Sequence, residues 1–233
     1  MRWLFVVFVV FVVACSKPSQ EHAAAISSAA PKEYATTSRI GSLAPNTGIP
    51  VGSKAPDVRA RDLDGADVTL SALWSKGMIL LAFYRGGWCP YCNFEIHALS
   101  ASFPEYQKRG VTPVAVSVDR PDVEAKTKAT YAIPFPVLSD TEANVIDAFH
   151  VAKTVSAEEF AKMKSNGIDL ESQSGSARHV IAIPALFLID QQGVVRWAHS
   201  DPDFKARPST AQILAAIDAV ERNQRPRAGV SAE

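Results

Sequence analysis

The chain has few cysteines, no excess of charge and no apolar run long enough to span a membrane. Only three of its 233 residues are cysteine, and 24 basic residues balance 24 acidic ones. Without a net charge, the chain has no overall field that would attract nucleic acid or another polyanion. The longest apolar run, from Trp3 to Ala14, is shorter than the roughly 20 residues that a membrane-spanning helix needs. Hydrophobic residues still make up 47% of the chain, which is ample for the core of one domain.

The amino terminus has the pattern of an export signal. Arg2 precedes the apolar run, and Val12-Val13-Ala14-Cys15 closes it. This ending resembles the lipobox of bacterial lipoproteins, which implies cleavage after Ala14 and a diacylglyceryl group on the sulfur of Cys15. Because Ser16 follows instead of aspartate, the resemblance implies a lipid-anchored protein of the bacterial cell envelope, at the outer membrane facing the periplasm in a Gram-negative cell. The alternative is a plain secretory signal with Cys15 incidental, and the protein is exported in both cases.

Composition divides the chain into four parts. We expect a signal peptide at residues 1–14. A lipidated N-terminus and flexible linker are expected at 15–50, because this stretch is rich in Ala, Ser, Thr and Pro and has few large apolar residues. The folded domain is expected at 51–221, and the polar residues 222–233 are expected to form a disordered tail.

Within 51–221, short apolar runs alternate with segments of helical periodicity. Pro104 interrupts the helical pattern that follows the second and third cysteines, and it should kink or break that helix. This order of elements predicts an α/β fold, in which helices cover both faces of a central sheet. The expected strands are 78–84, 112–118, 135–138, 185–189 and 194–198, and the expected helices are 96–106, 123–131, 142–149, 157–164 and 210–220.

Cys89 and Cys92 lie where the first long strand is followed by a helix. The free N–H groups and partial positive charge of a helix N-terminus stabilise a thiolate, so a cysteine there has a lowered pKa and is nucleophilic near neutral pH. The Cys-x-x-Cys spacing lets the second thiol resolve a disulfide formed on the first. Pro90, between them, suits the first turn of a helix. We therefore expect a reactive pair.

Two other uses of a cysteine pair fit the sequence less well. A structural zinc site needs about four ligands, but only His97 lies near the pair and no other histidine has ligand spacing. A structural disulfide is compatible with export, but so short a loop would constrain the unfolded chain little. We expect neither a metal nor another cofactor.

The residues around the pair resemble a known family. Trp88-Cys89-Pro90-Tyr91-Cys92 after a buried strand is similar to a thioredoxin-fold active site, and Cys-Pro-Tyr-Cys is also the glutaredoxin sequence. The wider resemblance is to the peroxiredoxin-like branch of the alkyl hydroperoxide reductase/thiol-specific antioxidant (AhpC/TSA) family. It implies a thioredoxin-like fold, a mixed sheet with helices on both faces, over nearly all of residues 51–221. The matching segments are Gly52–Asp57, Leu63–Leu70, Phe187–Asp190, Gly193–Arg196 and Ala198–Phe204.

The resemblance leaves open which cysteine attacks. Peroxiredoxins carry Pro-x-x-x-Thr-x-x-Cys, often with a Glu three residues later. On this chain the attacking cysteine then falls on Cys92 and the Glu on Glu95, while the Thr position is Cys89 and the Pro position is Arg85. Thioredoxins instead attack with the first cysteine, here Cys89. For disulfide exchange Cys89 is favoured, because the first cysteine of such a turn is usually the more exposed.

Other residues near the pair have alternative roles. Peroxiredoxins have an arginine beside the thiolate where this chain has Pro184, and Ile183-Pro184-Ala185 instead resembles the cis-proline loop of thioredoxins. We expect a cis peptide bond before Pro184; the alternative is a trans proline that opens a strand. Arg85 either supplies positive charge near the thiolate or ends the strand in solvent.

Aromatic and acidic neighbours of the pair also allow two interpretations. Tyr84 and Trp88 either shape the mouth of the site or are core aromatics with one exposed edge. Glu95 either relays a proton or, as we favour, interacts with the dipole at the start of the helix. His97 is expected to be a packed or surface residue rather than a base.

The resemblance implies a thiol-dependent redox enzyme. The first hypothesis is an antioxidant peroxidase that reduces hydroperoxides through Cys89 and Cys92, and a thioredoxin-like or other dithiol donor regenerates the pair. The second is a thioredoxin-like oxidoreductase that reduces disulfides of exported proteins. The third is a non-catalytic lipoprotein that uses the fold as a binding module or copper carrier. Residues 151–182 exceed the minimal thioredoxin fold, and the sequence does not decide whether they form a lid or a docking face.

Overall fold

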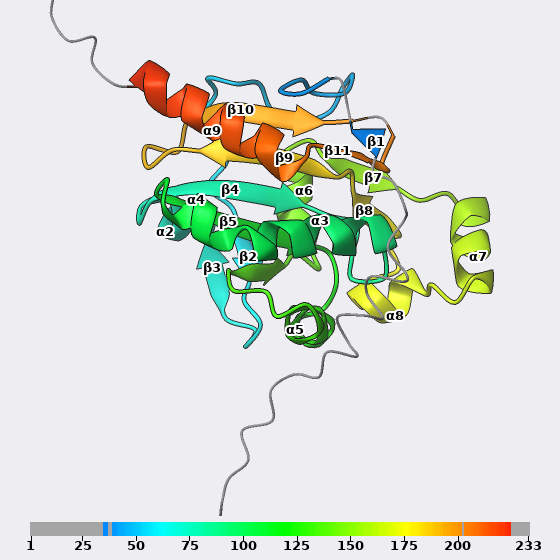
Figure 1. The fold of residues 1–233 in the computed structure, drawn as a ribbon. Coiled ribbons are helices and arrows are strands. Elements are labelled where there is room, and N and C mark those ends of the chain that lie inside the picture. Colours follow the sequence, from blue (N-terminus) through cyan, green and yellow to red (C-terminus); the bar gives the residue numbers. More distant parts are fainter. Residues whose placement is uncertain (1–34, 37–38, 202, 225–233) are drawn as a thin grey trace, which may run out of the picture. The chain divides into compact units, whose positions relative to one another are not determined.

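A seven-stranded mixed sheet forms the centre of the computed structural model, which describes residues 35–36, 39–201 and 203–224 (Figure 1). The predicted α/β architecture is confirmed. β4 pairs in parallel with β5 and antiparallel with β9. In spatial order the strands are β10 (Val195–Ser200), β9 (Ala185–Ile189), β4 (Met78–Phe83), β5 (Val111–Ser117), β6 (Val137–Ser139), β2 (Arg59–Arg61) and β3 (Asp67–Thr69).

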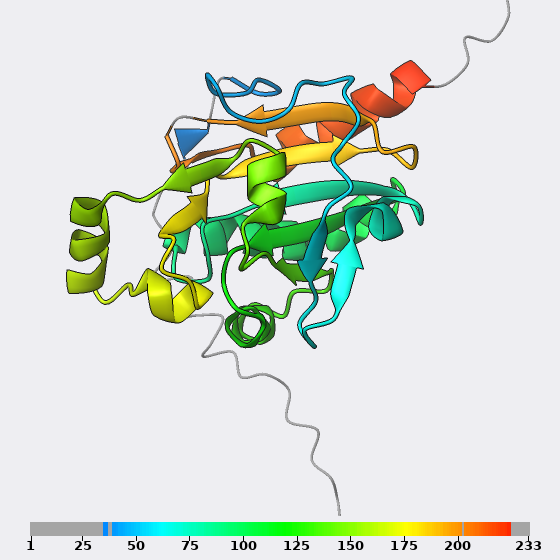
Figure 2. The same cartoon turned by 180° about the vertical axis from the view of Figure 1, so that it is seen from behind.

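Helices pack on both faces of the sheet because the side chains of β4 alternate between two apolar cores (Figures 1 and 2). Leu81 and Phe83 join one core, and Leu80 joins the other, which also contains both cysteines of the pair. The first core includes residues of α2 (Leu70–Trp74) and α6 (Asn144–Ala148). The second includes residues of α3 (Pro90–Ala101), α4 (Phe103–Gln107) and α9 (Thr210–Gln224), while α5 (Pro121–Thr130) packs beside β6.

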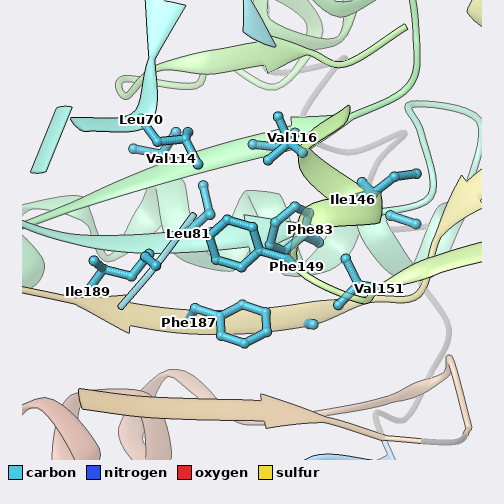
Figure 3. Packing of buried hydrophobic residues seen from close by; sticks show 14 of the residues in the cluster. Leu70, Leu81, Phe83, Val114, Val116, Ile146, Phe149, Val151, Phe187 and Ile189 are labelled. Carbon is cyan, nitrogen blue, oxygen red and sulfur yellow. The ribbon is translucent and has the colours of Figure 1, made fainter. Parts of the chain in front are cut away.

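Three aromatic rings lie at the centre of the first core (Figure 3). The ring centroid of Phe83 is 5.2 Å from that of Phe149 and 5.8 Å from that of Phe187, and Phe149 and Phe187 are 5.2 Å apart. Their tilted and edge-on arrangements are the favourable ones for aromatic pairs. These contacts hold β4 and β9 together immediately before the chain enters the cysteine turn.

The predicted break at Pro104 is confirmed. α3 ends at Ala101, α4 begins at Phe103, and Pro104 lies in the first turn of α4. Proline is tolerated there because the first N–H groups of a helix have no intrahelical acceptor.

Residues 151–182 form an excursion beyond the end of the sheet to which β4 points (Figure 1). It consists of β7 (Ala152–Thr154), α7 (Ala157–Ser165), α8 (Leu170–Ser174) and β8 (Val180–Ala182). The excursion has a small buried core, and Trp88 packs against it. It therefore contacts the loop that carries the cysteines.

Residues before the predicted domain boundary also pack on the domain. Ala44 and Ile49 are buried, and the backbone N–H of Ala44 donates to the Ser200 hydroxyl at 2.9 Å. The packed part of the chain therefore begins earlier than residue 51, because Ile49 of the expected linker belongs to the first core. Nearby, β1 (Ala35–Thr36) pairs in parallel with β11 (Ala206–Arg207).

Some predictions concern residues outside the described part of the chain. The signal peptide, Cys15 and residues 225–233 all lie there. α9 continues through Gln224, which is beyond the predicted end of the domain at 221. Of the helices in the described residues, none has the length and apolar character needed to cross a membrane.

Candidate redox site

Both cysteines are positioned by the start of α3. Cys89 is the N-cap residue with extended backbone, and Pro90 opens the helix. The N–H of Cys89 donates to the carbonyl of Gly86 at 3.1 Å, which closes the turn after β4. Neither thiol forms a disulfide, and exposure does not separate them, since Cys89 is 1% exposed and Cys92 is 0% exposed. The expectation that Cys89 would be clearly the more exposed thiol is therefore not met.

Hydrogen bonding and charge, however, make the two thiols very different. The hydrogen bond from the Cys92 thiol is the largest cause that lowers the pKa of Cys89 to about 6, against the opposing effect of burial. The backbone N–H of Cys92 and the charges of Arg85 and Arg207 act in the same direction. Burial raises the pKa of Cys92 well above its ordinary value. The site thus favours one thiolate, on Cys89, stabilised by a neutral thiol on Cys92.

Arg207 is a site residue that the sequence did not reveal. Its Nη2 atom lies 3.8 Å from the Cys92 sulfur, and its Nε atom donates to Glu95 Oε2 at 2.9 Å. The Arg207 and Glu95 side chains are only 4% and 6% exposed, so this is a buried ion pair beside a reactive sulfur. Arg207 and Cys92 are 115 positions apart in the chain, and no local pattern connects them.

Glu95 therefore does not interact with the dipole at the start of the helix, as we had favoured. It lies beyond the first turn of α3, and its carboxylate is held by Arg207 rather than by the helix dipole. Burial raises the pKa of Glu95, while the charge and hydrogen bond of Arg207 oppose this effect. His97, two residues later, is exposed and lies away from the buried site, as expected for a surface residue.

Arg85 supplies positive charge at the site rather than ending the strand in solvent. Its backbone N–H donates to the Cys92 sulfur, with 3.5 Å between nitrogen and sulfur. Its guanidinium carbon is 4.9 Å from the ring centroid of Trp88 and 4.3 Å from that of Phe204. Such contacts between a guanidinium and aromatic faces are favourable. Trp88, which is half-buried, therefore shapes the surroundings of the pair together with Phe204.

Tyr84 is a core residue and does not shape the mouth of the site. It is 1% exposed, and its hydroxyl donates to a carboxylate oxygen of Glu124. Glu124 is buried with Asp119, whose carboxylate accepts the N–H of Gly87 at 2.8 Å. Burial raises the pKa of Asp119 to about 6; burial and the charge of Asp119 raise the pKa of Glu124 to about 8. The sequence did not reveal this buried pair of carboxyl groups.

The two glycines before Trp88 are required by this packing. Gly86 has a φ of +141°, and a Cβ atom there would lie 2.4 Å from Trp88 Nε1. A Cβ on Gly87 would lie 2.2 Å from Thr127 Oγ1. A side chain at 86 would therefore collide with Trp88 and Asp119, and one at 87 would collide with Thr127 of α5.

The predicted cis bond before Pro184 was wrong, because the peptide is trans. The N–H of Ile183 donates to the carbonyl of Val151 at 2.6 Å, and Ala185 already pairs with β4. The chain is therefore extended on both sides of Pro184, and an ordinary trans proline opens β9. Pro184 still lies near the site, since it lines the same cavity as Arg85 and Phe204.

Known proteins share this sequence pattern. The family model described as AhpC/TSA family matches residues 51–198. Thiol-disulfide oxidoreductase ResA of Geobacillus thermodenitrificans is 35% identical over 106 residues, which cover 45% of this chain and 60% of that protein. Thiol-disulfide oxidoreductase ResA of Bacillus subtilis is 33% identical over 105 residues, with coverages of 45% and 58%. The chain thus spans about 60% of the length of these curated relatives.

Solved structures share the fold. Peroxidoxin BcpB of Mycobacterium tuberculosis matches with a TM-score of 0.58 and 22% identity, over 77% of this chain and 99% of that one. A mutant of peroxiredoxin 6 of Arenicola marina matches with a TM-score of 0.61 and 16% identity, over 80% and 82% of the two chains. At these identities the likeness concerns the fold alone, which is thioredoxin-like. The family model covers more than half of the chain and includes the Cys89–Cys92 turn, and the chain therefore belongs to the AhpC/TSA family.

Proposed function

We propose that this chain is a thiol-disulfide oxidoreductase in which Cys89 attacks and Cys92 resolves. The observation that carries the proposal is the asymmetry of the pair: the pKa of Cys89 is lowered to about 6, and that of Cys92 is raised by burial. Only the thiolate is a nucleophile. The thiol-disulfide oxidoreductases among the relatives support the same class of reaction.

The reaction has two steps. The Cys89 thiolate attacks one sulfur of a substrate disulfide, forms a mixed disulfide and releases the other sulfur as a thiolate. Cys92 then loses its proton and attacks the Cys89 sulfur, which forms the Cys89–Cys92 disulfide and releases the second substrate thiolate. Two electrons pass from the pair to the substrate. A thioredoxin-like or other dithiol donor reduces the pair again.

Hydroperoxide reduction is the second candidate function. In this reaction a thiolate attacks the O–O bond, becomes a sulfenic acid and releases an alcohol or water; the other cysteine condenses with it and water leaves. Arg207, 3.8 Å from the Cys92 sulfur, favours this candidate because it supplies the positive charge that position 184 lacks. It ranks second because Cys92, at the peroxiredoxin position, is the thiol whose pKa burial raises.

We also propose that the protein is exported and lipid-anchored through Cys15. The support is the N-terminal sequence, in which an apolar run of signal-peptide length ends at Ala14-Cys15. In bacterial cells grown with labelled palmitate, the wild type should incorporate the label and Cys15→Ser should not. Equal incorporation by both proteins would contradict the anchor.

For disulfide exchange, we predict that reduced Cys92→Ser forms a stable mixed disulfide with insulin, because it retains the attacking thiolate and lacks the resolving thiol. Both variants carry Cys15→Ser, and Cys89→Ser should form none at the same pH, since burial raises the pKa of Cys92. Mass spectrometry after acid quenching measures the adducts, and turnover of insulin by the wild type is followed beside it. If only Cys89→Ser captured insulin, the roles of the two cysteines would be reversed. If the wild type did not reduce insulin, the proposed function would be contradicted.

For hydroperoxide reduction, we predict that Arg207→Gln lowers the rate of hydrogen peroxide consumption by about tenfold, as expected for the loss of one charge-assisted contact at the sulfur. Arg61→Gln is the control, because Arg61 is exposed on β2. A thioredoxin-coupled assay measures the rates, and urea unfolding checks that both variants remain folded at the assay temperature. Equal rates for Arg207→Gln and the wild type would remove the argument for the peroxidase candidate.

A further inference from the structure

A cavity of about 310 Å³ adjoins the cysteine turn. Its size lies at the lower end of the range for small-molecule sites. Most of its lining is apolar. Arg85 also lines it, and the backbone N–H of Arg85 donates to the Cys92 sulfur at 3.5 Å. Its lining includes Arg85, Lys153, Glu159, Pro184, Asp201 and Phe204. We call this cavity the substrate groove.

The excursion of residues 151–182 forms one wall of the substrate groove, since Lys153, Glu159, Ile181 and Ala182 line it. From this wall Lys153 and Glu159 contribute opposite charges, which pair with each other at 2.6 Å. Asp201 also lines the groove, and its carboxylate accepts the N–H of Asp203 at 2.9 Å. The hydrogen bond from Lys153 is the largest cause that lowers the pKa of the Glu159 carboxyl, and Arg85 is near enough for its charge to help lower it.

Arg85 differs from the other arginine near the cysteines. Arg207 pairs with Glu95, whereas the Arg85 guanidinium has no carboxylate within 4 Å and no hydrogen-bond partner among the described residues. Its planar face is held by Trp88 and Phe204, which fixes the orientation of its N–H donors. A stacked guanidinium with unused donors, lining a groove, matches the planar geometry of a carboxylate.

We propose that the substrate groove binds a small disulfide whose carboxylate lies a few bonds from its sulfur, and that Arg85 pairs with this carboxylate. The short range follows from the closeness of Arg85 to the attacking sulfur, since its charge helps to stabilise the Cys89 thiolate and its backbone N–H donates to the neighbouring Cys92 sulfur. This inference rests on the proposed disulfide chemistry of Cys89. In the reaction, Cys89 attacks the substrate disulfide, Cys92 displaces the second half, and both carboxylate-bearing halves leave as thiols.

Three disulfides with the same two-carbon arm test the proposal: 3,3′-dithiodipropionate carries carboxylates, bis(2-hydroxyethyl) disulfide is neutral, and cystamine carries ammonium groups. The reduced Cys15→Ser protein is mixed with each at pH 8, which lies above the pKa of about 6 for Cys89. Quenched-flow mass spectrometry measures the loss of free thiols. We expect Arg85→Gln to lower the ratio of the anionic to the neutral rate by about tenfold relative to the wild type, as for one charge-assisted hydrogen bond.

Comparing variants with the same probes cancels the intrinsic reactivity of each probe. Arg61→Gln removes an equal charge at a distant exposed site and should keep the wild-type ratio. If Arg85→Gln slows all three probes equally, Arg85 acts only on the thiolate and the inference is wrong. The inference is also wrong if Arg61→Gln lowers the ratio of the anionic to the neutral rate as much, because the effect then comes from the net charge of the protein. If the wild type reduces none of the probes and does not reduce insulin, the proposed function itself fails.

Discussion

The hydrogen bond from the Cys92 thiol to the Cys89 sulfur is the interaction on which the chemistry of this site depends. It stabilises a thiolate on Cys89 in a place where burial alone would favour the neutral thiol. The donor keeps its proton because Cys92 is itself fully buried. One cysteine is thus prepared to attack, and the other stays protonated until a mixed disulfide removes the negative charge beside it.

Two arginines from distant parts of the chain surround this pair in different ways. Arg207 is buried and held by Glu95, and it reaches the Cys92 sulfur from β11. Burying an ion pair is costly because both charges lose their hydration, so the pair adds little net stability to the fold. Removal of one partner typically lowers the stability of a protein by about 3–5 kcal/mol, because the other charge is left buried and unpaired. The Arg207–Glu95 pair is therefore better explained by the need for a fixed charge beside the cysteines. Arg85 is half-buried between Trp88 and Phe204 and faces the substrate groove. The charges of both arginines lower the pKa of Cys89, and we assign to Arg85 the additional role of binding the substrate.

The local pattern of the sequence was sufficient to predict β4, the helix after it and the cysteine pair at their junction, because these features depend on apolar periodicity and on spacing. It could not reveal Arg207, Asp119 or Glu124, which look like ordinary surface residues until the fold brings them against the cysteine turn. The trans bond at Pro184 shows the same limit, since the extended path from β8 into β9 is a tertiary feature.

The central claim is that the reduced pair holds one thiolate near neutral pH. The most direct test is a titration of the reduced Cys15→Ser protein, followed by thiolate absorbance near 240 nm, with Cys92→Ala in the same background. We predict that one thiolate forms with a midpoint near pH 6 and that the second forms only above the ordinary thiol range. Removal of the Cys92 donor should raise the first midpoint. Two thiolates that form together at an ordinary cysteine pKa, with no shift in Cys92→Ala, would contradict this account.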